Sequence, residues 1–270
     1  MIMVKFFSLL FLAVDVVMEV QRSKPSINHR FSSLRYMRVV KQFNPIQRGY
    51  ISRRNMGNLL HIPNHLMVPL SLLQWLVDHI VYGSGGVFKK KNKTIHFTKH
   101  IVDKVFGFES GTIPYALASE DPVIVGEVEA LRMFYAKGKH IPIKHLDSIL
   151  LGTNNEVVFM RSFVLYFITT VLCPSTYNFV NPKFLYALTH RDMHQVQELD
   201  LGNLCIGHLF EEIDTWKDRV FNGDGDYNRE TWIGGCLPVL AVCFLNFCML
   251  SFLVSPFFTV CMFLWLVCFD

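Results

Sequence analysis

Apolar residues recur at helical spacing along most of this chain, and residues 156–172 form the strongest example. This stretch, EVVFMRSFVLYFITTVL, is apolar on nearly all sides, which is typical of a helix buried in a protein core. Its charge-free part is about a dozen residues long, which is too short to span a bilayer. We therefore expect a central core helix, capped by Asn154. Within it, the Arg161 guanidinium requires a carboxylate or carbonyl partner.

Several other segments carry one apolar face each. The segment VPLSLLQWLVDHI places five large apolar residues on one side of a helix: Leu72, Leu73, Trp75, Leu76 and Ile80. Asn181 and Pro182 provide a cap and a first helical residue for another helix. Further helices are predicted within residues 121–140, 141–152, 191–199 and 203–221.

The pattern changes after the glycines at positions 83, 85 and 86. Residues 87–97 read as a β-hairpin with Lys91 and Asn92 at its tip. Thr98 is a suitable N-cap for a short helix that Gly107 ends.

These elements predict a mainly α fold, a single multi-helix domain with one small β-hairpin at about residues 87–97. We assign residues 1–45 to a poorly defined basic lead-in that holds a short amphipathic helix near residues 31–43. The helical domain is expected to cover residues 46–242, with a helix ending near Gly57, and residues 243–270 form an apolar helical tail.

The tail has two interpretations. No charged residue occurs from Ile233 to Phe269, and this length exceeds the roughly 20 apolar residues that a membrane span needs. It is therefore a candidate C-terminal transmembrane anchor. However, no basic cluster flanks it, and its joint enrichment in Phe and Cys is typical of translated non-coding sequence, so a gene-model artefact is the other interpretation. The first twenty residues raise the same question.

Charge is distributed unevenly along the chain. Residues 21–102 contain fourteen Lys or Arg and one acid, Asp78, whereas residues 109–230 contain ten basic and seventeen acidic residues. Either the basic and acidic surfaces face each other or are simply solvated, or the basic part presents a face to nucleic acid or another polyanion.

Six basic residues are the candidate polyanion contacts. The hairpin lysines can contact phosphates, although lysines at a hairpin tip commonly serve solubility alone, and the same ambiguity applies to the arginine pair. The candidates are Arg53, Arg54, Lys89, Lys90, Lys91 and Lys93.

No catalytic, metal-binding or cofactor-binding residues emerge from the sequence. The histidines and cysteines lack zinc-ligand spacing, and Cys173, which precedes Pro174, reads as a buried structural thiol. The acidic segment NGDGDYNRE has Tyr227 and Ile233 where a calcium loop needs Gly and Glu. We therefore expect a non-enzymatic protein, whereas a deep pocket with clustered polar residues would favour an enzyme.

Four stretches of the chain resemble one known family. They are GNLLHIPNHLMVPLSLLQWLVDHI, KTIHFTKHIVDKVFGFESG, ILLGTNNEVVFMRSFVLYFITTVLCPSTYNFVNPKFLYAL and WIGGCLPVLAV. The third, an Arg-bearing apolar helix that ends in Leu-Cys-Pro-Ser, is the most characteristic. Over about residues 46–242 the chain is similar to the plant mobile domain, a transposon-related family also labelled "aminotransferase-like".

The resemblance implies an α-helical domain of nuclear proteins, associated with transposon silencing or genome maintenance and without established catalytic residues. Protein or chromatin partners are expected on that basis, and we expect non-specific nucleic acid to bind the basic N-terminal part. The leading expectation is a non-enzymatic interaction domain in the nucleus. The alternative is a membrane protein that displays this domain through the tail, residues 236–269.

Overall fold

A computed structural model describes residues 27–252, apart from residues 65–67, 92, 176, 190–195, 197 and 223–230. The described chain is mainly helical with a small antiparallel strand pair, which confirms the expected fold class. Residues 1–26 of the predicted lead-in and residues 253–270 of the predicted tail lie outside the described residues, as does most of the segment NGDGDYNRE.

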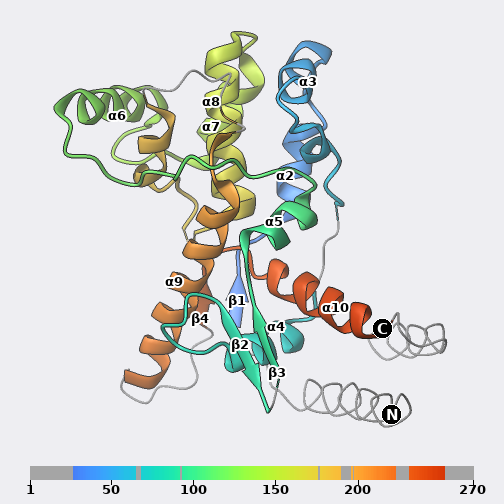
Figure 1. Ribbon diagram of the computed structural model, residues 1–270. Helices are drawn as coiled ribbons and strands as arrows, with labels where there is room; N and C mark the ends of the chain where they lie inside the picture. The colour runs from blue at the N-terminus through green and yellow to red at the C-terminus, as the bar shows by residue number, and fades with distance from the viewer. Residues whose placement is uncertain are drawn as a thin grey trace.

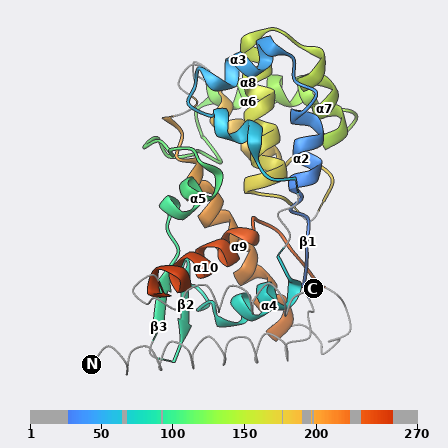
Figure 2. The same ribbon diagram turned by 90° about the vertical axis from the view of Figure 1, so that its right-hand side faces the viewer.

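The helices gather in two groups (Figures 1 and 2). In both views one end contains α2, α3, α6, α7 and α8, the other end contains α4 and the hairpin β2–β3, and α9 runs between them. The bounds of the α-helices are α2 Ser33–Val40, α3 Pro45–Ser52, α4 Leu70–His79, α5 Lys99–Phe106, α6 Pro122–Tyr135, α7 Ile143–Gly152, α8 Glu156–Phe167, α9 Leu201–Asn222 and α10 Pro238–Phe252. The shorter elements are β1 Ile27–His29, η1 Gly57–His61, β2 Val87–Lys90, β3 Lys93–His96, η2 Ile168–Leu172, η3 Pro182–Leu188 and β4 Thr231–Ile233.

Helix α8 is the centre of the core, as its apolar pattern predicts. Phe159, Phe163 and Phe167 are spaced four residues apart, so their rings lie above one another on one side of the helix. The first two ring centroids are 6.2 Å apart and the second two 6.5 Å apart, with the planes nearly parallel. All three side chains are fully buried.

The core helix continues past Phe167 with a change of winding. Residues Ile168–Leu172 form a π-helical turn, in which the Cys173 amide donates to the Ile168 carbonyl at 2.7 Å. Pro174 follows at once and cannot continue the hydrogen-bond pattern, so the helix ends here.

Residues 27–45 belong to the folded core, in contrast to the lead-in expected from the sequence. Tyr36 of α2 stacks on Tyr166 with ring centroids 5.9 Å apart, and Phe43 packs edge-on against Phe159 at 5.3 Å. The polar residues between them gave the segment its weak apolar pattern. Its few large apolar side chains nevertheless find partners on α8, which lies more than a hundred residues further along the chain.

The hairpin and the helix after it have the predicted bounds. β2 and β3 pair antiparallel, with Val87 opposite His96 and Lys90 opposite Lys93. Gly107 ends α5 in the left-handed conformation, with φ of 68°, where a glycine avoids the steric cost of a side chain. A second, two-stranded pair joins β1 to β4 in parallel.

Two predicted helix boundaries are wrong. Asn155, not Asn154, caps α8 by accepting a hydrogen bond from the Val158 amide at 3.1 Å. Helix α3 ends at Ser52, before Gly57, because Asn55 adopts a left-handed backbone conformation that interrupts the helix.

The first part of the apolar C-terminal run belongs to the domain core. Phe244 of α10 packs against Trp75 at 5.3 Å and against Phe88 at 5.8 Å, and Leu237, Val239 and Leu240 are buried. Among the described residues, no helix has the length and apolar character that crossing a membrane requires. Burial in the core, where α10 packs against α4 and α5, thus accounts for the apolar pattern of residues 236–244.

Candidate functional site

The six candidate polyanion contacts occupy two separate places. Arg53 and Arg54 follow α3, whereas the four lysines lie on the β2–β3 hairpin, and Figure 1 shows these elements at opposite ends of the molecule. The structure therefore does not bring the six residues together on one face.

Arg54 is an interior residue. Its side chain is 4% exposed, and its guanidinium lies 2.6 Å from a carboxylate oxygen of Glu156. It also donates to the Tyr50 carbonyl at 2.9 Å. The hydrogen bond from Arg54 lowers the pKa of Glu156, because it favours the charged carboxylate. Arg54 thus joins α3 to the start of α8 instead of offering a charge to a ligand.

Arg53 is more accessible but is also engaged. Its side chain is 62% exposed and lies 3.5 Å from the same Glu156 carboxylate. Its guanidinium also stacks over the Tyr50 ring at 5.1 Å. An exposed pair of this kind contributes little to stability, so Arg53 remains able to turn toward a ligand.

The hairpin lysines form a cationic tip. Lys89, Lys91 and Lys93 are exposed, while Lys90 is half-buried with its ammonium 4.6 Å from the centre of the Trp75 ring. Lys91 takes φ of 49° in the turn between the two strands. Since Phe88 and Ile95 anchor the strands in the core, the lysines are held on a rigid support.

Among the described residues, ion pairs join the basic and acidic parts of the chain at two places. At one, Arg53 and Arg54 both pair with Glu156, and at the other the Lys99 ammonium lies 3.1 Å from the Asp200 carboxylate. In both, a residue of the basic N-terminal part contacts an acid of the later part. The first interpretation of the charge pattern, surfaces that face each other, therefore holds for these pairs, and the hairpin tip is the place where basic residues remain gathered at the surface.

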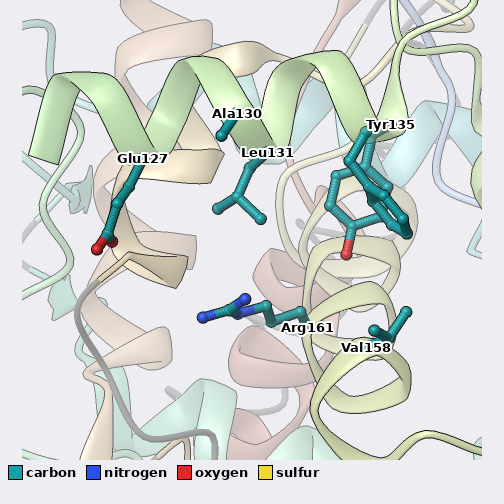
Figure 3. A pocket seen from close by; sticks show the side chains of 7 residues that line it. Glu127, Ala130, Leu131, Tyr135, Val158 and Arg161 are labelled. Carbon is teal, nitrogen blue, oxygen red and sulfur yellow. The ribbon is translucent and has the colours of Figure 1, made fainter.

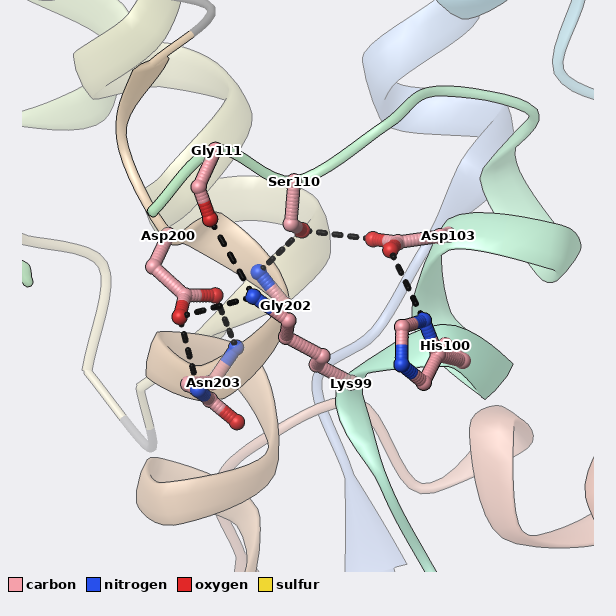
Figure 4. Close-up of polar contacts among 8 residues, drawn as sticks. All are labelled: Lys99, His100, Asp103, Ser110, Gly111, Asp200, Gly202 and Asn203. Carbon is pink, nitrogen blue, oxygen red and sulfur yellow. Dashed lines mark hydrogen bonds and ion pairs between the residues drawn. The ribbon is translucent and has the colours of Figure 1, made fainter. Parts of the chain in front are cut away.

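A polar network surrounds the Lys99–Asp200 pair, where α5 meets the start of α9 (Figure 4). Lys99 also donates to the Gly111 carbonyl at 3.2 Å. Asp200 caps α9 by accepting from the Asn203 amide at 3.1 Å. Ser110 accepts from the Gly202 amide at 2.7 Å, so two side chains satisfy amides in the first turn of α9.

The same network contains serine, aspartate and histidine, but their order is not that of a hydrolase. Ser110 donates to Asp103 at 2.5 Å, and the His100 ring lies 4.0 Å from the other oxygen of that carboxylate. Asp103 therefore lies between the serine and the histidine. In a catalytic triad the histidine lies between the other two, because it must take the proton from the serine. This arrangement fixes a helix end and does not activate Ser110.

A groove with a volume of about 720 Å³ opens beside this network. Its polar lining mixes both signs of charge, and it includes Arg54, Asp103, Lys104, Glu109, Ser110 and Glu198. This is the clustered polar pocket that would favour an enzyme. Arg54, Asp103 and Ser110 are already joined to other groups of the protein, which leaves them poorly placed to act on a substrate. In the described part of the chain, no group of three or more side chains has the arrangement of a metal site.

A second pocket, of about 400 Å³, lies between α6 and α8 (Figure 3). Its walls are mostly apolar and come from Ala130, Leu131, Phe134, Tyr135 and Val158, with Glu127 and Arg161 as the charged residues. Figure 3 shows Leu131 and Glu127 descending from α6 and Arg161 extending from α8 beneath them. The Tyr135 hydroxyl is occupied by a contact to the Ser162 hydroxyl at 3.0 Å.

Cys173, Cys205, Cys236 and Cys243 are buried free thiols, as interpreted for Cys173 from the sequence. Burial raises the pKa of the thiols of Cys173 and Cys236 and raises that of Cys243 to about 11. Since the thiolate is the reactive form, we expect iodoacetamide at neutral pH to leave all three unmodified in the native protein and to label them after denaturation. Peptide mapping by mass spectrometry tests this, and native labelling of Cys173 would contradict its buried position.

The family comparison agrees with the extent of the fold. Residues 29–241 match the profile of a family described as a domain of unknown function, DUF8566. The chain belongs to this family. No curated protein and no solved structure matches the chain. The matched DUF8566 region includes residues 29–45, in agreement with the packing of α2 into the core.

Sequence reasoning did not find the network around α9 of this DUF8566 domain. One local signal was present, because Asp200 precedes an amphipathic segment as N-cap residues do. No local pattern predicts the roles of Lys99 and Ser110 in this network. Each lies about a hundred residues before its partner, Asp200 for Lys99 and Gly202 for Ser110.

Proposed function

We propose that this protein is a non-enzymatic interaction domain that contacts nucleic-acid phosphates through the lysines of the β2–β3 hairpin. The resemblance to the plant mobile domain supports a transposon-related origin and a nuclear location, with a role in transposon silencing or genome maintenance. Protein or chromatin partners are part of the same proposal.

The proposal rests mainly on the position of three lysines, Lys89, Lys91 and Lys93, at the exposed tip of a short hairpin. The two strands of this hairpin are anchored in the core. No Asp or Glu occurs in residues 79–102, so the sequence around the tip is purely basic. Lysines that neutralise phosphates release condensed counterions, and this release drives binding without sequence specificity. Arg54 is excluded from the proposed face because it lies inside the protein.

The arrangement around Ser110 supports a role without catalysis. Its hydroxyl is used to fix the start of α9, and the carboxylate of Asp103 separates it from His100. In this arrangement Ser110 is not activated as a nucleophile. Binding, and not group transfer, is the activity that this geometry supports.

The proposal is tested with the triple variant Lys89→Gln, Lys91→Gln, Lys93→Gln of the full-length protein. Fluorescence anisotropy with a labelled DNA duplex measures binding between about 50 and 200 mM salt. We expect the variant to lose at least about tenfold in affinity at low salt. The slope of log K against log salt is expected to become shallower by about one for each lysine that contacts a phosphate.

The matched control removes three lysines elsewhere, with Lys137→Gln, Lys139→Gln and Lys144→Gln, which are exposed residues near α6 and α7. It changes the net charge equally, so a specific hairpin contact predicts wild-type slope and affinity for this control. Equal losses of affinity in the two variants would show that the net charge of the protein, and not a contact at the hairpin, causes the effect. Absence of wild-type binding at about 50 mM salt would exclude the proposed contact.

A further inference from the structure

Arg161 is a cation without a partner in the described part of the chain. Its Nε atom is buried and makes no hydrogen bond, and no ion pair joins its guanidinium to a described carboxylate. The sequence predicts a partner for this residue, and the structure instead directs the side chain into the pocket between α6 and α8.

Arg161 as a whole is half-buried, and its Nε–H is the part that is enclosed without an acceptor. A buried donor that makes no hydrogen bond is costly to the folded protein, because it has given up its contact with water. The planar guanidinium is also shaped to receive the two oxygens of a carboxylate. Arg161 is therefore prepared for an anionic group that comes from outside the described fold.

The pocket opens onto an apolar surface on α6. Val128 and Tyr135 are the buried residues of this helix, whereas Val123, Met133 and Phe134 are 60%, 73% and 51% exposed. Phe134 both lines the pocket and continues onto the surface. An apolar area that extends beyond the pocket fits a chain segment of another protein better than it fits a small molecule.

We propose that the α6–α8 pocket docks a peptide segment of a partner protein that carries an Asp or Glu beside large apolar side chains. The carboxylate pairs with Arg161, and the apolar side chains cover Leu131 and Phe134. Glu127, which lines the same pocket, has a contact of its own, and its charge directs the incoming carboxylate toward the Arg161 side. This site is independent of the hairpin contact proposed above.

The first test is the stability of the Arg161→Met variant. Because the variant replaces a buried donor that has no acceptor with an apolar side chain of similar length, we expect its melting temperature to rise above that of the wild type. If Arg161 had a purely structural role, the same substitution would lower the melting temperature. A fall would therefore overturn the assignment of Arg161 to a binding site.

The second test selects ligands from a random peptide library displayed on phage, with the full-length protein as bait. We expect the selected sequences to contain Asp or Glu next to Leu, Phe, Trp or Val. Arg161→Met is expected to weaken a synthetic copy of such a peptide by about tenfold to a hundredfold, and Phe134→Ser is expected to weaken it as well. The matched control is Arg132→Gln, which removes an arginine of α6 that pairs with Glu129 at the surface and leaves binding unchanged.

The remaining outcomes each contradict the peptide site. Selected peptides without an acidic residue, or with equal affinity for the Arg161→Met variant, would remove the role of the guanidinium. The phage selection could yield no binding peptide while hexanoate binds the pocket to saturation. This pair of results would identify a small carboxylate as the occupant. Dimerisation of the wild type that Arg161→Met abolishes in sedimentation experiments would identify a second copy of this chain.

Discussion

Replacing Phe163 with alanine is expected to lower the free energy of unfolding by about 3–5 kcal/mol. The ring is fully buried and lies between those of Phe159 and Phe167 on α8. It also contacts Phe43 edge-on, with ring centroids 6.1 Å apart. Alanine removes the buried apolar surface and leaves a cavity whose walls are held by three other rings.

Chemical denaturation followed by far-ultraviolet circular dichroism measures this loss for the full-length protein. Phe179→Ala is the matched control, because that ring is 40% exposed and rests on the His140 ring at 4.6 Å. We expect the control to cost less than about 1 kcal/mol. Equal losses at the two positions would contradict the central place of α8 in the core.

Local patterns were sufficient for the helices and the hairpin because their determinants are neighbours in the sequence. The apolar face around Trp75, the breaks at the glycines before Val87 and the left-handed stop at Gly107 each depend on a few adjacent residues. The core helix was predictable for the same reason, since a segment that is apolar on all sides is stable only when it is surrounded by protein.

The missed features depend on residues that are distant in the sequence. The parallel pairing of Ile27–His29 with Thr231–Ile233 joins the two ends of the domain. Neither short segment contains a local signal that predicts its partner strand. Helix α2 was assigned to a lead-in because the segment around it is basic and polar and lacks a strong apolar period. Its place in the core is set by Tyr166 and Phe167, whose rings contact Tyr36 although they lie more than a hundred residues further along the chain.

The candidate site shows the same limit. Composition identified the basic residues, but exposure separates them, since Arg54 is interior while Lys89, Lys91 and Lys93 are at the surface. The partner of a buried charge is also a long-range property. Arg54, which was expected to contact a polyanion, has a carboxylate partner inside the protein, whereas Arg161, which was expected to have a partner, pairs with no described carboxylate.

The paired arginine leads to the second large effect. Replacing Glu156 with glutamine is expected to lower the free energy of unfolding by about 2–3 kcal/mol at neutral pH. The substitution keeps the size of the side chain but removes the charge that compensates the interior guanidinium of Arg54, 2.6 Å away. Glu129→Gln is the matched control, because Glu129 is 58% exposed and its contact to Arg132 at 3.5 Å lies at the surface; we expect a change below about 1 kcal/mol there.

The pH dependence separates a charge effect from a packing effect at Glu156. Arg54 holds the pKa of Glu156 below its ordinary value in the folded protein, so the unfolded state binds the proton more readily. The stabilisation is therefore complete above the unfolded-state pKa and is lost as the pH falls through that value to the folded-state pKa. The stability difference between wild type and Glu156→Gln should be constant above about pH 5 and decrease below it. A difference that stays the same down to about pH 3 would mean that the glutamine disturbs packing and that the charge of Glu156 does not hold Arg54 in place.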